Sequence, residues 1–122
     1  MGVGMPTTLL LDEFGYMIWS AFGHYAYHVG SSVFGKTWRD VDVRLILEDE
    51  KYERMGLGDP KRPHENKKWV ALTLAFSALG KEMTGLPIDF QIQQQSDAND
   101  TYSQKDGNVR SALGCVARIR KE

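Results

Sequence analysis

Two aspartates separated by one residue, Asp40 and Asp42, stand at the start of the apolar run Val41–Leu47. If this run is a strand, the two carboxylates point to the same face of the sheet, about 7 Å apart along the chain. Carboxylates that close repel each other, and a divalent cation is the commonest compensating charge. Ligands that are all oxygen favour Mg²⁺ or Mn²⁺ over zinc. The pair therefore predicts a metal site.

A Gly30-Ser31 turn precedes the aspartate pair, with the first aspartate ten positions after the glycine. Glycine lets the backbone approach a phosphate closely, and successive backbone N–H groups bind its negative charge. Lys36 and Arg39 follow in the same loop, where each either contacts phosphates or is simply solvated. Trp38 either stacks on a base or packs against the edge of the sheet. We predict nucleotide binding by Gly30, Ser31, Lys36 and Arg39.

A third aspartate, Asp89, stands near the start of a second alternating segment, residues 88–93. If this segment is a strand beside the first, its carboxylate converges on those of Asp40 and Asp42. Three carboxylates around one or two Mg²⁺ ions are typical of phosphoryl and nucleotidyl transfer. We predict that all three aspartates are catalytic and hold the metal, although Asp89 alone could instead cap a turn. Arg44 shares the face of Asp42 and is either an ion-pair partner of the cluster, which we favour, or a substrate contact.

Apolar residues at spacings of three and four predict two long helices, and alternation predicts three strands. The helices cover residues 9–22 and 66–84, and the strands cover residues 24–29, 41–47 and 88–93. Thr7 or Thr8 is expected to cap the first helix, which Gly23 ends, and Gly85 ends the second. The face of the first helix that packs on the core is expected to comprise Leu9, Leu10, Phe14, Met17, Ile18 and Ala21.

The remaining segments are polar and have weaker patterns. Residues 48–67 predict a surface excursion with a short helix near residues 52–55, and residues 109–119 predict a small helix or an edge strand. Together, the predicted helices and strands indicate an α+β fold with an α/β-type mixed sheet of three or more strands and two long helices on one face. The other face is then available for a site. We expect a core over residues 1–95, with residues 96–122 a polar segment of the same domain that could be mobile.

The composition is that of an ordinary globular protein of 122 residues with a net charge of −1. This charge argues against a generally basic nucleic-acid binder. The single cysteine, Cys115, excludes an internal disulfide and a cysteine-based zinc site within one chain. His24 and His28 alternate onto one face of their strand, as a metal pair or as half-buried histidines. Because a membrane-spanning run and a signal-peptide layout are both missing from the sequence, we expect a cytoplasmic protein without membrane contact.

The motifs form a recognisable set along the chain. They are Gly30-Ser31, Gly35, Asp40-Val41-Asp42 followed by Val43, Leu45 and Leu47, and Ile88-Asp89-Phe90. This set resembles the signature of the nucleotidyltransferase superfamily that includes DNA polymerase beta, and above all its minimal, single-domain members from bacterial and phage genomes. The resemblance covers roughly residues 9–93. It implies that Gly30 and Ser31 bind the triphosphate. It also implies that Asp40, Asp42 and Asp89 hold the metal, with Asp89 helping to activate the acceptor hydroxyl.

We therefore expect an enzyme that uses Mg²⁺ or Mn²⁺ to move a nucleoside monophosphate from an NTP to a protein, RNA or small-molecule acceptor. Many members of that family have one or two more residues between the turn and the first aspartate, and this chain has no recognisable acceptor-binding domain. The alternative is thus a catalytically inactive nucleotide-binding module, or one that depends on a partner subunit. The apolar surface of the second helix also allows a homodimer. A nucleic-acid binder without chemistry is the third candidate.

Overall fold

A four-stranded mixed sheet lies at the centre of the computed structural model, which describes residues 5–29, 41–101 and 110–121. Its strands are β1 (Ala26–Val29), β2 (Val41–Leu47), β3 (Ile88–Gln94) and β4 (Arg110–Ala112), in the spatial order β3-β2-β1-β4. β2 is parallel to β3 and antiparallel to β1, and β1 is antiparallel to β4. The predicted bounds of β2 are correct, those of β3 differ by one residue, and β1 begins two residues later than predicted.

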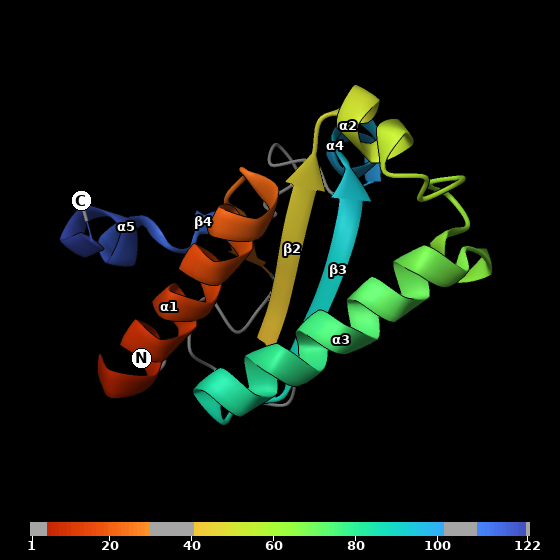
Figure 1. The fold of residues 1–122 in the computed structure, drawn as a ribbon. Coiled ribbons are helices and arrows are strands. Elements are labelled where there is room, and N and C mark those ends of the chain that lie inside the picture. Colours follow the sequence, from red (N-terminus) through yellow and green to blue (C-terminus); the bar gives the residue numbers. More distant parts are fainter. Residues whose placement is uncertain (1–4, 30–40, 102–109, 122) are drawn as a thin grey trace.

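Two long helices, α1 (Met5–Phe22) and α3 (Lys67–Thr84), lie on the same face of the sheet (Figure 1). Three shorter helices are α2 (Asp49–Arg54), α4 (Gln95–Thr101) and α5 (Cys115–Lys121), and a 3₁₀ turn spans Pro63–Glu65. In Figure 1, α2 and α4 lie together where β2 and β3 end, and α5 lies beside α1. The predicted α+β class, with two long helices on one face of a mixed sheet, is confirmed.

The core lies between the sheet and the two long helices. Every second residue of β2 is fully buried, namely Val41, Val43, Leu45 and Leu47. Phe90 of β3 lies between Phe14 of α1 and Phe76 of α3, with ring centroids 6.4 and 5.3 Å away. The predicted alternation of β2 and β3 is therefore confirmed, and the opposite sides of both strands face away from the core.

Helix α1 differs from its prediction in its start and in its buried face. It begins at Met5, so Thr7 and Thr8 lie within the helix and neither caps it. Proline is well tolerated in the first turn of a helix, so Pro6 does not prevent this earlier start. Three of the predicted core residues are 41–44% exposed, namely Leu9, Leu10 and Met17, and Ala21 is exposed as well. The buried side chains are Leu11, Phe14 and Ile18, because a helix that is apolar on most sides does not reveal its inner face by periodicity.

Helix α3 begins and ends as its sequence predicts. The side chain of Asn66 accepts a hydrogen bond from the backbone N–H of Trp69, and Gly85 ends the helix in the left-handed region at φ +75°. The helix also protects the outer edge of β3. The indole N–H of Trp69 donates to the carbonyl of Ile92 at 2.8 Å, and the backbone N–H of Phe90 donates to the Ser77 hydroxyl at 3.0 Å. These bonds occupy edge groups that could otherwise pair with another chain.

The C-terminal part of the chain contains more regular structure than its polar composition predicts. Helix α4 is joined to α2 by Ser96, whose hydroxyl and backbone N–H both donate to Asp49 and lower the pKa of that carboxyl. The start of α5 is capped from α1, since the Asp12 carboxylate accepts from the N–H groups of Gly114 at 2.8 Å and Ala117 at 2.6 Å. Residues 109–119 were predicted as a small helix or an edge strand, and the structure contains both, β4 and α5. The contacts that hold α4 and α5 come from distant residues, which local patterns could not reveal.

Replacing Gly15 with alanine should destabilise the fold, although the same change in an ordinary helix stabilises it by about 1 kcal/mol. A Cβ at this position would lie 2.7 Å from the carbonyl carbon of Leu113 and 2.8 Å from the amide nitrogen of Gly114. We expect Gly15→Ala to lower the free energy of unfolding by about 1–3 kcal/mol in urea denaturation. Ser20→Ala, at an exposed position of the same helix, is the control and should be neutral or stabilising. Equal stability of the two variants would show that α1 and the segment before α5 are not in close contact.

Candidate functional site

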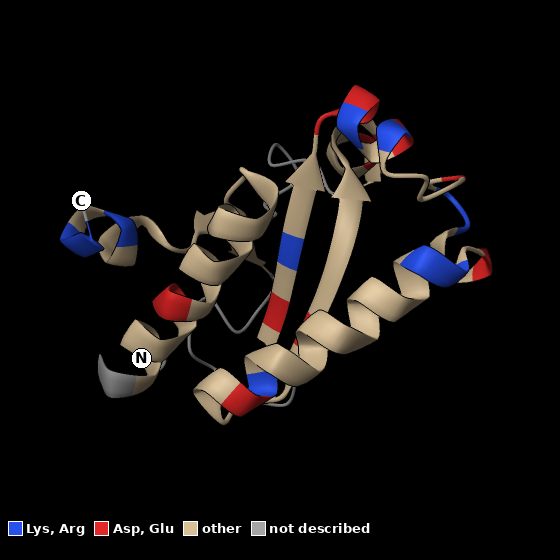
Figure 2. Ribbon diagram, viewed as in Figure 1, with Lys and Arg blue, Asp and Glu red and all other residues tan. Residues whose placement is uncertain are grey.

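The sheet face opposite α1 and α3 carries half-buried side chains from three strands. They are Tyr27 and Val29 of β1, Asp42, Arg44 and Ile46 of β2, and Asp89, Gln91 and Gln93 of β3. The charged residues of β2 are the two coloured bands on that strand in Figure 2. We call this surface the open face. It presents the residues that the sequence assigned to the site on β2 and β3.

Asp42 and Asp89 lie side by side on the open face. The parallel register of β2 and β3 pairs these two residues directly. Because neighbouring strands are about 4.8 Å apart, two ionised carboxylates at the same level repel each other. Their side chains are 34% and 42% exposed, so ions in solution can reach both. The two strands do lie side by side, which was the condition for a shared site, and their pairing brings two of the three predicted aspartates together.

Arg44 lies between the two carboxylates. Its Nη2 is 3.6 Å from Oδ1 of Asp42 and 3.3 Å from Oδ2 of Asp89. Its Nη1 donates a hydrogen bond of 2.6 Å to the backbone carbonyl of Asp89. The arginine side chain is only 13% exposed, so these contacts hold the guanidinium in a defined position. The favoured interpretation of Arg44 as an ion-pair partner of the cluster is confirmed.

The carboxylate pair has the donor chemistry of a magnesium site. Both side chains offer hard oxygen ligands and are accessible to a hydrated ion. Within residues 5–29, 41–101 and 110–121, no three His, Cys, Asp or Glu side chains are grouped so that they could hold a metal ion. Asp40, the third predicted ligand, lies outside this part of the chain. Asp42 and Asp89 thus fit part of a metal site, and its completion by Asp40 remains a prediction.

Five predicted site residues lie within residues 30–40, outside the described part of the chain. They are Gly30, Ser31, Lys36, Arg39 and Asp40. Both ends of this segment are described, and both lie beside the carboxylate pair. Val29 pairs with Asp42 across β1 and β2, and the backbone N–H of Val41 donates to the carbonyl of Pro87 at 2.8 Å. The sheet therefore anchors the segment at the same end as Asp42, and the binding roles of its residues remain predictions.

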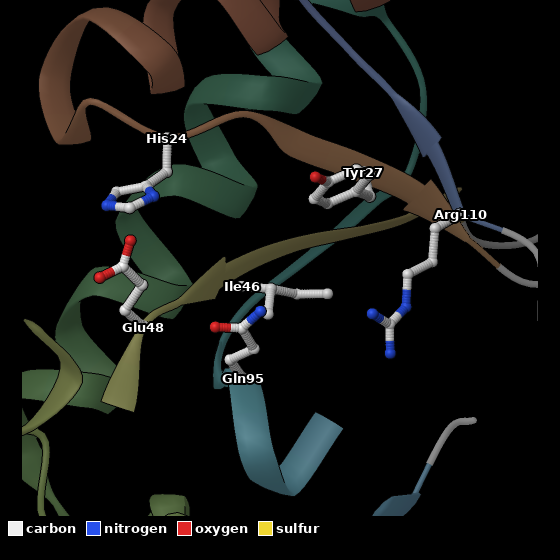
Figure 3. Close-up of a pocket in the computed structure, with 6 residues that line it drawn as sticks. All are labelled: His24, Tyr27, Ile46, Glu48, Gln95 and Arg110. Carbon is white, nitrogen blue, oxygen red and sulfur yellow. The ribbon is translucent and has the colours of Figure 1, made fainter. Parts of the chain in front are cut away.

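A pocket of about 230 Å³ opens on the same face (Figure 3). It is lined by His24, Tyr27, Ile46, Glu48, Gln95 and Arg110. Tyr27 pairs with Arg44 in the sheet, and Ile46 lies four residues, or about 13 Å, along β2 from Asp42. We call it the Tyr27 pocket. The sequence analysis missed it: alternation places Tyr27 and Ile46 on this face, but Gln95 and Arg110 come from the weakly patterned C-terminal part.

His24 and His28 do not form the metal pair that one interpretation allowed. His28 lies on the core side of β1 opposite Val43, where burial lowers the pKa of its imidazole. His24 instead precedes β1 and lines the Tyr27 pocket. The alternation expected for the two residues fails because β1 begins only at Ala26.

The chain was compared with protein-family models, curated proteins and solved structures, and none of them matches it. The resemblance of its motifs to nucleotidyltransferases therefore remains a prediction from the residues themselves. Among the described helices, none is long and apolar enough to cross a membrane.

Replacing Arg44 with methionine should destabilise the protein in a manner that depends on salt and metal. The variant keeps a long side chain but leaves Asp42 and Asp89 without the guanidinium between them. We expect a loss of about 1–2 kcal/mol at low ionic strength, measured by urea denaturation. Salt screens the repulsion between exposed carboxylates, so the loss should shrink at high salt. Added Mg²⁺ should also restore part of the stability.

Arg54→Met is the matched control, because Arg54 lies on the exposed side of α2. It should show neither the salt dependence nor the recovery with Mg²⁺. If Arg44→Met lost the same stability at low and high salt, its guanidinium would contribute by packing alone and would not balance the carboxylates.

Proposed function

We propose that the protein is a Mg²⁺-dependent nucleotidyltransferase that moves a nucleoside monophosphate from an NTP to an acceptor hydroxyl or phosphate. The observation that supports this most is the pairing of Asp42 with Asp89 on the open face of two parallel strands. Placing two accessible carboxylates at one level costs repulsion and desolvation. This arrangement does not stabilise the sheet. It does suit the binding of a cation together with a polyphosphate.

In this proposal, Asp42, Asp89 and the predicted Asp40 hold the metal. The ion, when bound, neutralises the triphosphate charge and polarises the phosphoryl oxygens. Asp89 accepts the proton of the acceptor hydroxyl and later releases it to solvent. The acceptor oxygen forms a bond to the α-phosphorus while the bond from that phosphorus to the pyrophosphate oxygen breaks, and pyrophosphate leaves. Arg44 orients Asp89, because it contacts both its carboxylate and its backbone carbonyl.

The segment 30–40 supplies the phosphate-binding groups in this proposal. Gly30 and Ser31 bind the triphosphate through backbone N–H groups and a hydroxyl, with Lys36 and Arg39 as additional cations. The position of both segment ends beside Asp42 supports this assignment. The acceptor is a protein, an RNA or a small molecule, and we place the reaction in the cytoplasm. A homodimer or a partner subunit could supply the acceptor site.

A catalytically inactive nucleotide-binding module is the second candidate, and the position of Arg44 favours it. The guanidinium already neutralises part of the charge on Asp42 and Asp89 without a metal. If the arginine permanently took the place of the metal ion, the domain could bind a nucleotide without transferring a nucleoside monophosphate from it. The two candidates differ in the release of pyrophosphate.

Removing one carboxylate should separate these possibilities. We expect Mg²⁺ with at least one of the four NTPs to raise the melting temperature of the wild-type protein. Asp42→Asn should abolish the Mg²⁺-dependent part of that shift. With an extract containing RNA and small molecules as acceptors, the wild type should release pyrophosphate. The variant should release it at least about 100-fold more slowly.

Glu82→Gln is the control for the loss of a carboxylate, because Glu82 is exposed on α3, on the other side of the sheet. It should behave as the wild type. No thermal shift with any NTP would contradict nucleotide binding and therefore both candidates. A shift without pyrophosphate release would instead support the inactive module.

A further inference from the structure

One end of the Tyr27 pocket carries the cation of Arg110. Arg110 of β4 pairs with Val29 of β1, which pairs in turn with Asp42. The three residues therefore form one row across the sheet, and Arg110 is level with the carboxylates. Its guanidinium is held by hydrogen bonds to the Asn99 side chain at 3.0 Å and to the carbonyl of Ala98 at 3.3 Å. This end of the pocket suits an anionic group.

The opposite end of the pocket carries a carboxylate. Glu48 directly follows the last residue of β2, and Figure 3 shows its side chain and that of His24 pointing toward one another. Glu48 precedes α2, but its side chain forms no capping hydrogen bond with that helix. In the figure, Arg110 and Glu48 lie on opposite sides of Ile46 and Gln95. A ligand that fits has an anion at one end and a hydrogen-bond donor at the other.

The middle of the pocket is suited to a flat ring. Tyr27 and Ile46 extend from neighbouring strands on the open face and provide an aromatic and an aliphatic surface. The amide of Gln95, at the start of α4, both donates and accepts hydrogen bonds. Aromatic side chains stack on nucleobases without regard to sequence, and glutamine and glutamate read the polar edges of bases.

We infer that the Tyr27 pocket binds the base of a nucleotide whose phosphates lie toward Arg110, in the row of the sheet that also contains Asp42. Tyr27 stacks on the base, and Gln95 and Glu48 contact its polar edge. A carboxylate accepts hydrogen bonds from an exocyclic amino group, which adenine, cytosine and guanine carry. Both exocyclic groups of uracil are carbonyl oxygens, which a carboxylate repels, and its N3–H is the single donor on that edge. The pocket therefore selects nucleotides with an amino-bearing base over uridine nucleotides. The position of the phosphates rests on the proposed function, but the base preference does not.

Nucleoside monophosphates without metal test the base pocket separately from the transfer reaction. The dissociation constants of AMP, CMP, GMP and UMP would be measured on the full chain by calorimetry, with and without Mg²⁺, and then those of the four NTPs. We expect at least one amino-bearing nucleotide to bind about 10-fold more tightly than UMP. Glu48→Gln should reduce this preference to about 2-fold or less. Tyr27→Leu should weaken the binding of every nucleotide about 10-fold, whereas Tyr27→Phe should retain it.

Glu50→Gln is the matched control, because Glu50 is an exposed residue of α2 that does not line the pocket. It should leave the base preference unchanged. Asp42→Asn should remove the gain in NTP affinity from Mg²⁺ but leave the preference among monophosphates intact. Such a preference without any effect of Mg²⁺ would support the base pocket while contradicting the transferase. Equal binding of AMP, CMP, GMP and UMP, or wild-type binding by Glu48→Gln and Tyr27→Leu, would overturn the inference even if Mg²⁺-dependent transfer were found.

Discussion

The parallel pairing of β2 with β3 is the constraint on which the site depends. Its register is set by the buried neighbours, which pair Val41 with Ile88 and Val43 with Phe90 against the helices. A slip by one residue would exchange the two faces of a strand, so that a carboxylate would enter the core. The register that buries the apolar residues therefore also places Asp42 beside Asp89. The hydrophobic core, and not any attraction within the site, holds the two like charges together.

The same pairing explains why the open face is chemically unusual. Parallel strands occur mostly where both faces of a sheet are covered, but here the two long helices cover one face only. The side of the parallel pair that faces away from these helices carries charges that balance one another: two carboxylates, with Arg44 between them. Helix α3 closes the outer edge of β3 through Trp69, so the strand that bears the second carboxylate is protected from pairing with another chain. The site is thus exposed at its face and protected at its edge.

Local patterns predicted the elements that have a strong local signal. β2 was predicted with its bounds and its faces because four buried aliphatic residues alternate with polar ones, apart from Ile46. Helix α3 was predicted to within one residue because its apolar spacing is regular and Gly85 ends it, whereas the structure shows Asn66, predicted as its first residue, to be its N-cap. The inner face of α1 was predicted only in part, since its apolar residues surround most of the helix. Phe14 and Ile18 are buried as predicted, but the other four predicted residues are exposed and Leu11 was missed. The site followed the same rule. The aspartates were predicted from their spacing along the chain, whereas the Tyr27 pocket was not predicted because part of its lining comes from the weakly patterned C-terminal segment.

The sequence by itself determined which strand residues face away from the core and hence that Asp42, Arg44 and Asp89 share an open face once their strands pair. Tertiary structure alone decided that β3 lies beside β2 in register and that Arg44 reaches both carboxylates. It also decided the C-terminal elements, whose partners, such as Asp12 for α5 and Asp49 for α4, are distant in the chain. The physical reason is the range of the interactions. Alternation and helix caps depend on residues within a few positions, whereas register, ion pairs and the Tyr27 pocket require contacts between segments that only the packed core brings together.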